Sequence, residues 1–299
     1  MLKMILKIVA IICLTLTQLS VSLQAQTGSS ALAIDVRVVG EDSARDVILI
    51  PGLSSPGEVW NSTVKALGGN YRFHIVSLPG FAGTPPVDTE KPFIEAMAED
   101  IVDYITENGI EQPVLAGHSL GGFLSLYIGV QHPDLPAKIV SVDGVPFLPA
   151  MVNPYMTEES AQSMAENMRS QMLNATREQR LAQQQQVIQT MVTDPEKQKV
   201  AVDWSMNSDI ETVAASVHYL YSTDLRDDLS AIKVPVLVFG AWKAYESYGV
   251  TKEMSRQMYS RQYSEVNQLT LEISDTGRHF LMWDDPELII NGMAGFLSE

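Results

Sequence analysis

The sequence has 299 residues, of which 45% are hydrophobic and 19% are charged, and it contains a single cysteine. This length and composition fit one large globular domain with a sizeable core, and they argue against a disordered chain. The formal net charge of −16 argues against binding to nucleic acid or to an anionic membrane, because such a surface repels phosphate groups.

The first 25 residues have the pattern of a secretory signal peptide. Lys3 and Lys7 give a basic start, Ile8–Leu16 is an apolar run, and small or neutral residues follow up to Ala25. We expect cleavage after Ala25, which would remove two lysines and no acid and leave a periplasmic or secreted protein with a net charge of −18. The alternative is an uncleaved N-terminal anchor, for which the apolar run is short. Cys13 lies in this segment, so the mature chain would have neither a catalytic thiol nor a disulfide.

Short apolar runs alternate with helical patterns along most of the remaining chain. The expected strands are residues 33–39, 47–50, 73–77, 113–116, 138–142, 234–239 and 269–273. The expected helices are residues 56–67, 92–108, 120–131, 251–263 and 286–297. Runs that are apolar throughout are typical of parallel strands buried on both faces. The alternation of strand and helix therefore predicts an α/β fold with a doubly wound, mostly parallel sheet.

One region lacks strand-like runs and is expected to be an inserted helical lid at residues 146–228. Residues 158–193 are rich in the helix formers Gln, Met, Glu and Ala, and residues 204–221 form a second helical pattern. The lid would divide the core domain into residues 26–145 and 229–299. Its methionines could line an adaptable apolar pocket, but plain core packing is the more common role at helical spacing.

The strongest chemical signal is the stretch Gly117-His118-Ser119-Leu120-Gly121-Gly122 between a predicted strand and a predicted helix. A serine at a sharp strand-to-helix turn needs small residues two positions before and after it, and Gly117 and Gly121 fill these positions. Such a turn raises the Ser119 hydroxyl above the sheet, and the Leu120 N–H can bind an oxyanion. His118 is expected to be structural. The alternative is a glycine-rich turn that only packs.

With this motif, residues 31–299 resemble the α/β-hydrolase fold family, specifically a serine esterase or lipase with a helical lid. The resemblance also rests on Pro51-Gly52-Leu53 after an early strand and on Gly277-Arg278-His279-Phe280 after the last one. It implies that Ser119 is the nucleophile and His279 its base. It also implies that the second oxyanion N–H belongs to Leu53. The family commonly has His-Gly where this chain has Pro51-Gly52.

The acidic member of the triad departs from the usual family pattern. Most members place it in Gly-x-x-Asp after the penultimate strand, where this chain has Lys243. A minority place it after the strand that precedes the lid, which here is followed by Asp143. Asp143 is therefore the first candidate, while Glu246, Asp275 or the absence of an acid remain as alternatives.

These residues predict a serine hydrolase that acts on a carboxylic ester or related acyl substrate, with an apolar acyl or alcohol part, through an acyl-enzyme on Ser119. The alternatives are a peptidase or amidase, a carbon–carbon bond hydrolase, and a non-catalytic ligand-binding member of the fold. We expect no metal and no cofactor, because no histidine pair has ligand spacing and no dinucleotide or phosphate-loop motif occurs. We also expect no stable membrane span after signal removal.

Overall fold

The computed structural model describes residues 32–42 and 44–298, so the predicted signal peptide at residues 1–25 lies outside the described residues. The strands are β1 (Asp35–Val39), β2 (Arg45–Ile50), β3 (Tyr71–Ser77), β4 (Val114–His118), β5 (Lys138–Val142), β6 (Val236–Gly240) and β7 (Leu269–Ile273). They form one sheet in the order β1-β3-β2-β4-β5-β6-β7. Only the pairing of β1 with β3 is antiparallel. The predicted fold class is confirmed.

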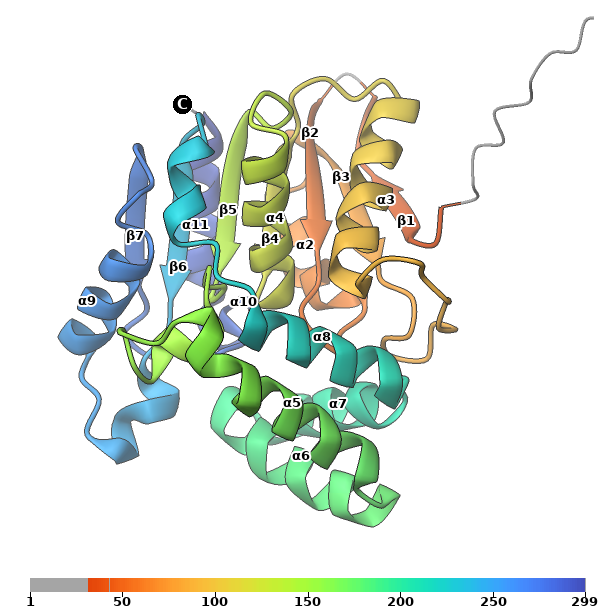
Figure 1. Ribbon diagram of the computed structural model, residues 1–299. Coiled ribbons are helices and arrows are strands. Elements are labelled where there is room, and N and C mark those ends of the chain that lie inside the picture. Colours follow the sequence, from red (N-terminus) through yellow and green to blue (C-terminus); the bar gives the residue numbers. More distant parts are fainter. Residues whose placement is uncertain (1–31, 43, 299) are drawn as a thin grey trace, which may run out of the picture. The chain divides into compact units, whose positions relative to one another are not determined.

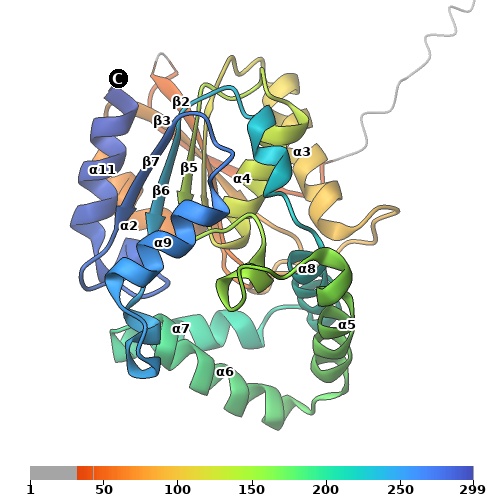
Figure 2. The same ribbon diagram turned by 60° about the vertical axis from the view of Figure 1, so that its left-hand side comes forward.

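Helices cover both faces of this sheet (Figure 1). The α-helices are α2 (Asn61–Leu67), α3 (Phe93–Glu107), α4 (Leu120–Gln131), α5 (Glu158–Asn174), α6 (Arg177–Met191), α7 (Pro195–Met206), α8 (Ile210–Ser222), α9 (Lys252–Gln262), α10 (Leu281–Asp284) and α11 (Pro286–Ser298). Short 3₁₀ helices are η1 (Gly57–Trp60), η2 (Leu148–Met151), η3 (Asp227–Ala231) and η4 (Lys243–Tyr248). Helices α3, α4 and α9 lie on one face, and α2 and α11 on the other (Figure 2).

The sheet separates two hydrophobic cores because successive side chains of a strand point to opposite faces. In β2, Val47 and Leu49 belong to the core under α2 and α11, whereas Ile48 and Ile50 belong to the core under α3, α4 and α9. All four side chains are fully buried. This explains why the strands are continuous apolar runs in the sequence rather than alternating ones.

Residues 143–235, all of which the structure describes, contain no strand and carry α5 to α8 between β5 and β6. These four inserted helices lie beyond the carboxyl ends of the parallel strands (Figure 1). The predicted helix boundaries in this region are wrong. Residues 158–193 form two helices, and residues 204–221 span the end of α7 and most of α8. The physical reason is capping, because Thr176 accepts a hydrogen bond from the first turn of α6 and Asp209 from that of α8.

Backbone hydrogen bonds tie the inserted helices to two loops of the core. Between α7 and α8, the Asp209 N–H donates to the Gly80 carbonyl over 2.7 Å, and the Gly83 N–H donates to the Asn207 carbonyl over 3.0 Å. At the end of α6, the Met191 carbonyl accepts from the N–H of Phe280 over 3.2 Å. The inserted helices are therefore attached to the loops after β3 and β7.

Three methionines of the insertion pack against the two cores. Met151 and Met172 contact the core under α3, α4 and α9, and Met191 contacts the core under α2 and α11. Met164 is more exposed. Within the described part of the chain, no helix has the length and apolar character needed to cross a bilayer.

Candidate active site

Ser119 occupies a sharp turn between β4 and α4. Its backbone dihedrals are φ 54° and ψ −115°, in the region that L-residues rarely adopt. The Ser119 N–H donates to the Val142 carbonyl over 2.9 Å, and the Ser119 carbonyl accepts from the Phe123 N–H over 3.0 Å. A backbone conformation of this kind costs roughly 1–3 kcal/mol and persists only where the surrounding structure stabilises it. These two hydrogen bonds fix the Ser119 backbone on both sides.

The glycines around Ser119 are required by close backbone contacts. A Cβ at Gly117 would lie 1.9 Å from the Gly121 carbonyl oxygen, and a Cβ at Gly121 would lie 2.3 Å from that of Ile50. Neither partner is a flexible side-chain end that could move away. The two glycines therefore allow the turn to close directly above β2 and β4, as the sequence motif predicts.

Two backbone N–H groups are candidates for binding an oxyanion. Leu120 is the first residue of α4, where N–H groups have no acceptor within the helix and the helix dipole favours negative charge. Leu53 lies in the turn after β2, which is closed by a 3.1 Å hydrogen bond from the Ser55 N–H to the Gly52 carbonyl. This turn contacts the serine, since a Cβ on Gly52 would be 3.2 Å from the Ser119 Cβ.

His279 and Asp143 are hydrogen-bonded to one another. The distance from His279 Nδ1 to Asp143 Oδ2 is 2.6 Å, and the two side chains are 21% and 11% exposed. A carboxylate at Nδ1 makes this nitrogen the protonated one and leaves Nε2 as the proton acceptor. The arrangement gives His279 the tautomer that a general base requires.

Asp143 directly follows β5 at the carboxyl edge of the sheet. Its φ of 50° is in the left-handed region, and its N–H donates to the Phe239 carbonyl over 2.7 Å. Its second carboxylate oxygen, Oδ1, accepts from the Ala241 N–H over 2.8 Å and from the Tyr259 hydroxyl. Both oxygens of the partly buried carboxylate thus have donors, which offsets the cost of removing it from water.

The other two candidate acids lie elsewhere. Glu246 pairs with Lys243 over 2.7 Å, and its side chain is 54% exposed. Asp275 pairs with Lys252 over 2.6 Å at the surface, and its side chain is 82% exposed. Of the three carboxylates considered from the sequence, Asp143 is the one that the structure places against His279.

His118 packs beside the candidate base. Its ring centroid lies 4.7 Å from that of His279, and its Nε2 donates to the His279 carbonyl over 3.0 Å. Burial lowers the pKa of His118 well below its ordinary value, with a smaller contribution from His279. His118 is therefore a neutral residue whose N–H orients the backbone of the base, in agreement with the structural role expected from the sequence.

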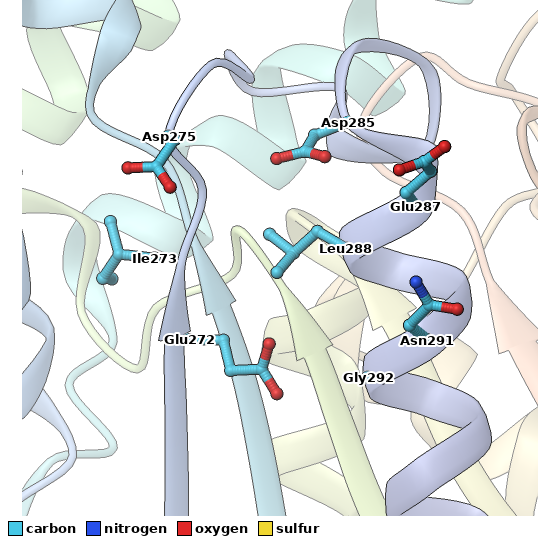
Figure 3. Close-up of a pocket in the computed structure, with 8 residues that line it drawn as sticks. All are labelled: Glu272, Ile273, Asp275, Asp285, Glu287, Leu288, Asn291 and Gly292. Atoms are coloured by element: carbon cyan, nitrogen blue, oxygen red, sulfur yellow. The ribbon is translucent and has the colours of Figure 1, made fainter.

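A separate acidic hollow of about 500 Å³ lies between β7 and α11. Figure 3 shows the residues that line it: Glu272, Ile273, Asp275, Asp285, Glu287, Leu288, Asn291 and Gly292. Apart from Asp275, the rejected alternative acid, it contains none of the predicted site residues. In the described residues, no group of three or more His, Cys, Asp or Glu side chains is arranged to hold a metal ion.

Sequence reasoning missed the partners of Asp143. Tyr259 carries no motif, and the Ala241 N–H has no side-chain signal at all. Tyr259 and Tyr263 are spaced by four residues, which indicates a shared helix face. That pattern, however, indicates packing and does not predict a hydrogen bond to a residue 116 positions away.

The sheet order, the serine turn and the His–Asp pair at its carboxyl edge define an α/β hydrolase. A family model described as the alpha/beta hydrolase family matches residues 47–291. The chain therefore belongs to this family.

The individual relatives share a quarter or less of their aligned residues with this chain. The chain is similar to a pimeloyl-acyl-carrier-protein methyl ester esterase from Vibrio atlanticus, with 25% identity over 223 residues that cover 73% of this chain and 84% of the relative. Among solved structures, it is similar to a hydrolase from Pseudomonas aeruginosa (TM-score 0.73, 16% identity, 89% of this chain and 94% of that one). It is also similar to the enol-lactonase from Burkholderia xenovorans (TM-score 0.67, 18% identity, 89% and 96%).

Proposed function

We propose that the protein is a serine hydrolase of carboxylic esters, with Ser119 as nucleophile, His279 as base and Asp143 as the acid of the triad. The observation that carries this proposal is the 2.6 Å bond between His279 Nδ1 and Asp143 Oδ2, in a fold that also holds a serine in a strained turn. The similarity to curated methyl ester esterases supports an ester substrate.

The reaction has two chemical halves. His279 Nε2 takes the proton from the Ser119 hydroxyl as its oxygen bonds to the substrate carbonyl carbon, and the N–H groups of Leu120 and Leu53 stabilise the resulting oxyanion. The protonated base then transfers its proton to the departing alcohol, which leaves an acyl-enzyme. Water, activated by the same base, releases the carboxylic acid and restores Ser119. In both halves Asp143 accepts the hydrogen bond from His279 Nδ1 and stabilises the imidazolium.

The charge of the molecule favours an uncharged substrate. The segment 146–228 has twelve acidic and six basic side chains, in a chain with a net charge of −16. This field repels anionic molecules as they approach. We therefore propose a neutral ester with an apolar acyl or alcohol part, bound beneath the inserted helices, which act as a lid over the carboxyl edge of the sheet.

Hydrolysis of p-nitrophenyl esters by residues 26–299 tests the proposal. We expect turnover of short and medium acyl chains by the wild-type protein and its loss in Ser119→Ala and in His279→Ala. A fluorophosphonate probe should label the wild-type protein and leave Ser119→Ala unlabelled. Turnover that survives in Ser119→Ala would show that the nucleophile is wrong, and a labelled protein without ester turnover would favour the peptidase or amidase alternative.

We also propose that the protein is exported and that residues 1–25 are removed. The support is the basic start, the apolar run and the small residues before Ala25 in the sequence. N-terminal sequencing of the exported protein tests this, since a mature N-terminus near Gln26 is expected. An intact Met1 on a membrane-bound protein would favour the anchor instead.

A further inference from the structure

Two buried tyrosines, one on α9 and one just after it, reach the turn that carries Asp143. Tyr259 is 1% exposed and Tyr263 is fully buried. They are four residues apart and therefore lie on the same face of the helix, which packs against the sheet. Both hydroxyls bond to residues 141–144, at the end of β5 and directly after it. Tyr259 thus contacts Asp143 itself, and Tyr263 contacts the residues on either side of it.

The two carboxylate oxygens of Asp143 have separate partners. Oδ2 accepts from His279 Nδ1 over 2.6 Å, whereas Oδ1 accepts from the Ala241 N–H over 2.8 Å and from the Tyr259 hydroxyl. A carboxylate can rotate about its bond to Cβ, and a rotation would turn Oδ2 away from His279. Two donors on Oδ1, from the loop after β6 and from α9, oppose that rotation.

The Tyr259 hydroxyl remains protonated, and so remains a donor, throughout the pH range in which ester hydrolysis would be measured. Burial, followed by the charge of Asp143 and the hydrogen bond to it, raises the pKa of Tyr259 well above its ordinary value. The hydroxyl donates a hydrogen bond to Asp143 Oδ1. Tyr259 therefore presents a fixed proton to the carboxylate.

We propose that Tyr259 is a positioning residue that fixes the Asp143 carboxylate so that Oδ2 faces His279; this inference rests on the triad of the proposed function. The loop after β6 supplies the Ala241 N–H, and Tyr259 provides the second fixed donor. The acid after β5 is thus held by groups from two other elements.

Tyr263 offers a matched control at the end of the same helix. Its hydroxyl donates to the Gly144 carbonyl over 2.8 Å and is 3.1 Å from Ser141 Oγ, so it bonds to the same turn through groups other than the Asp143 carboxylate. Tyr259→Phe and Tyr263→Phe each remove one buried hydroxyl. Any general loosening of the turn would affect both variants, whereas a role through Asp143 would affect only the first.

We expect Tyr259→Phe to lower kcat at least ten-fold and to change KM less than two-fold, because the tyrosine acts through Asp143 rather than on the substrate. Tyr263→Phe should retain kcat within three-fold. The rate of fluorophosphonate labelling should fall in parallel with kcat. In an Asp143→Asn background, Tyr259→Phe should cause no further loss, since its effect passes through the carboxylate. Equal effects of the two tyrosine variants, or additive effects of Tyr259→Phe and Asp143→Asn, would overturn the inference.

A measurement without turnover separates this inference from the proposed function. The low-field proton resonance of His279 Nδ1–H reports its hydrogen bond to Asp143 directly. We expect the resonance to shift or broaden in Tyr259→Phe and to stay in place in Tyr263→Phe. A wild-type protein that neither hydrolyses esters nor reacts with the probe would refute the proposed function, while this comparison would still decide the role of Tyr259. An unchanged resonance in Tyr259→Phe would refute that role.

Discussion

Replacement of Asp143 by asparagine tests the triad most directly, because the structure determines how the new amide must lie. The Ala241 N–H and the Tyr259 hydroxyl both donate to Oδ1, so the amide oxygen of the new side chain would keep that position. The NH₂ group would then face His279 Nδ1 and donate to it. His279 would carry its proton on Nε2 and could no longer accept one from Ser119.

The magnitude follows from this tautomer. The same exchange in a Ser–His–Asp triad costs about 10⁴-fold in kcat, or about 5.5 kcal/mol of transition-state stabilisation. The amide could escape by rotating its oxygen toward His279. That rotation would set the NH₂ group against the Ala241 N–H, and a buried donor without an acceptor costs about 1–3 kcal/mol. The rotated form would therefore be about 5- to 150-fold less populated, so we expect kcat to fall by at least about 5-fold and by up to about 10⁴-fold.

Glu246→Gln is the matched comparison. This carboxylate is 54% exposed and pairs with Lys243, and exposed pairs of this kind contribute about 0–1 kcal/mol to stability. We expect kcat/KM for p-nitrophenyl esters to stay within about two-fold of wild type. Thermal denaturation should show that both variants are folded. Small and equal effects of the two substitutions would refute the assignment of Asp143 as the triad acid.

Further predictions concern two glycines and the buried His118. Gly121→Ala would place a Cβ 2.3 Å from the Ile50 carbonyl oxygen, so we expect lower stability, by about 1–3 kcal/mol or more, and little activity. Gly295→Ala on α11, where a Cβ meets nothing within 4 Å, should instead stabilise by about 0.5–1 kcal/mol in thermal denaturation. Because burial lowers the pKa of His118, the unfolded chain binds a proton that the folded chain does not, and stability falls as the pH drops below about 6.5. Urea denaturation should therefore show that the free energy of unfolding falls between pH 7 and pH 5, and that this fall is smaller in His118→Gln by up to about 2 kcal/mol. An identical pH dependence of the two proteins would contradict this.

The sheet could be predicted from the sequence because its strands are buried on both faces. The ranges 138–142 and 269–273 agree with the bounds of β5 and β7, and the remaining strands agree within two residues at each end. In such strands nearly every position must be apolar, so the run itself marks the element. The breaks between the inserted helices were harder to place, since they depend on single capping residues such as Thr176 and Asp209 within a long helix-forming composition.

The candidate site was predictable where local chain geometry determines it. Close backbone contacts within the turn require glycine two positions before and two positions after Ser119. Five consecutive residues therefore suffice to indicate the nucleophile. The acid remained open among three residues because its position depends on contacts between distant elements. Tyr259 is 116 residues from Asp143, and no periodicity in either segment indicates that they meet.

The two possible positions of the acid are close together in space because of the sheet register. Strands β5 and β6 are parallel neighbours in which Val142 pairs with Phe239, so the residues that follow them leave the sheet side by side. The Asp143 N–H donates to the Phe239 carbonyl, and the Ala241 N–H donates back to the Asp143 carboxylate. The loops that follow β5 and β6 therefore meet at the Asp143 carboxylate, which lies beside His279. A lysine at the usual acid position is then no evidence for a silent triad, which removes the sequence argument for a non-catalytic binding protein.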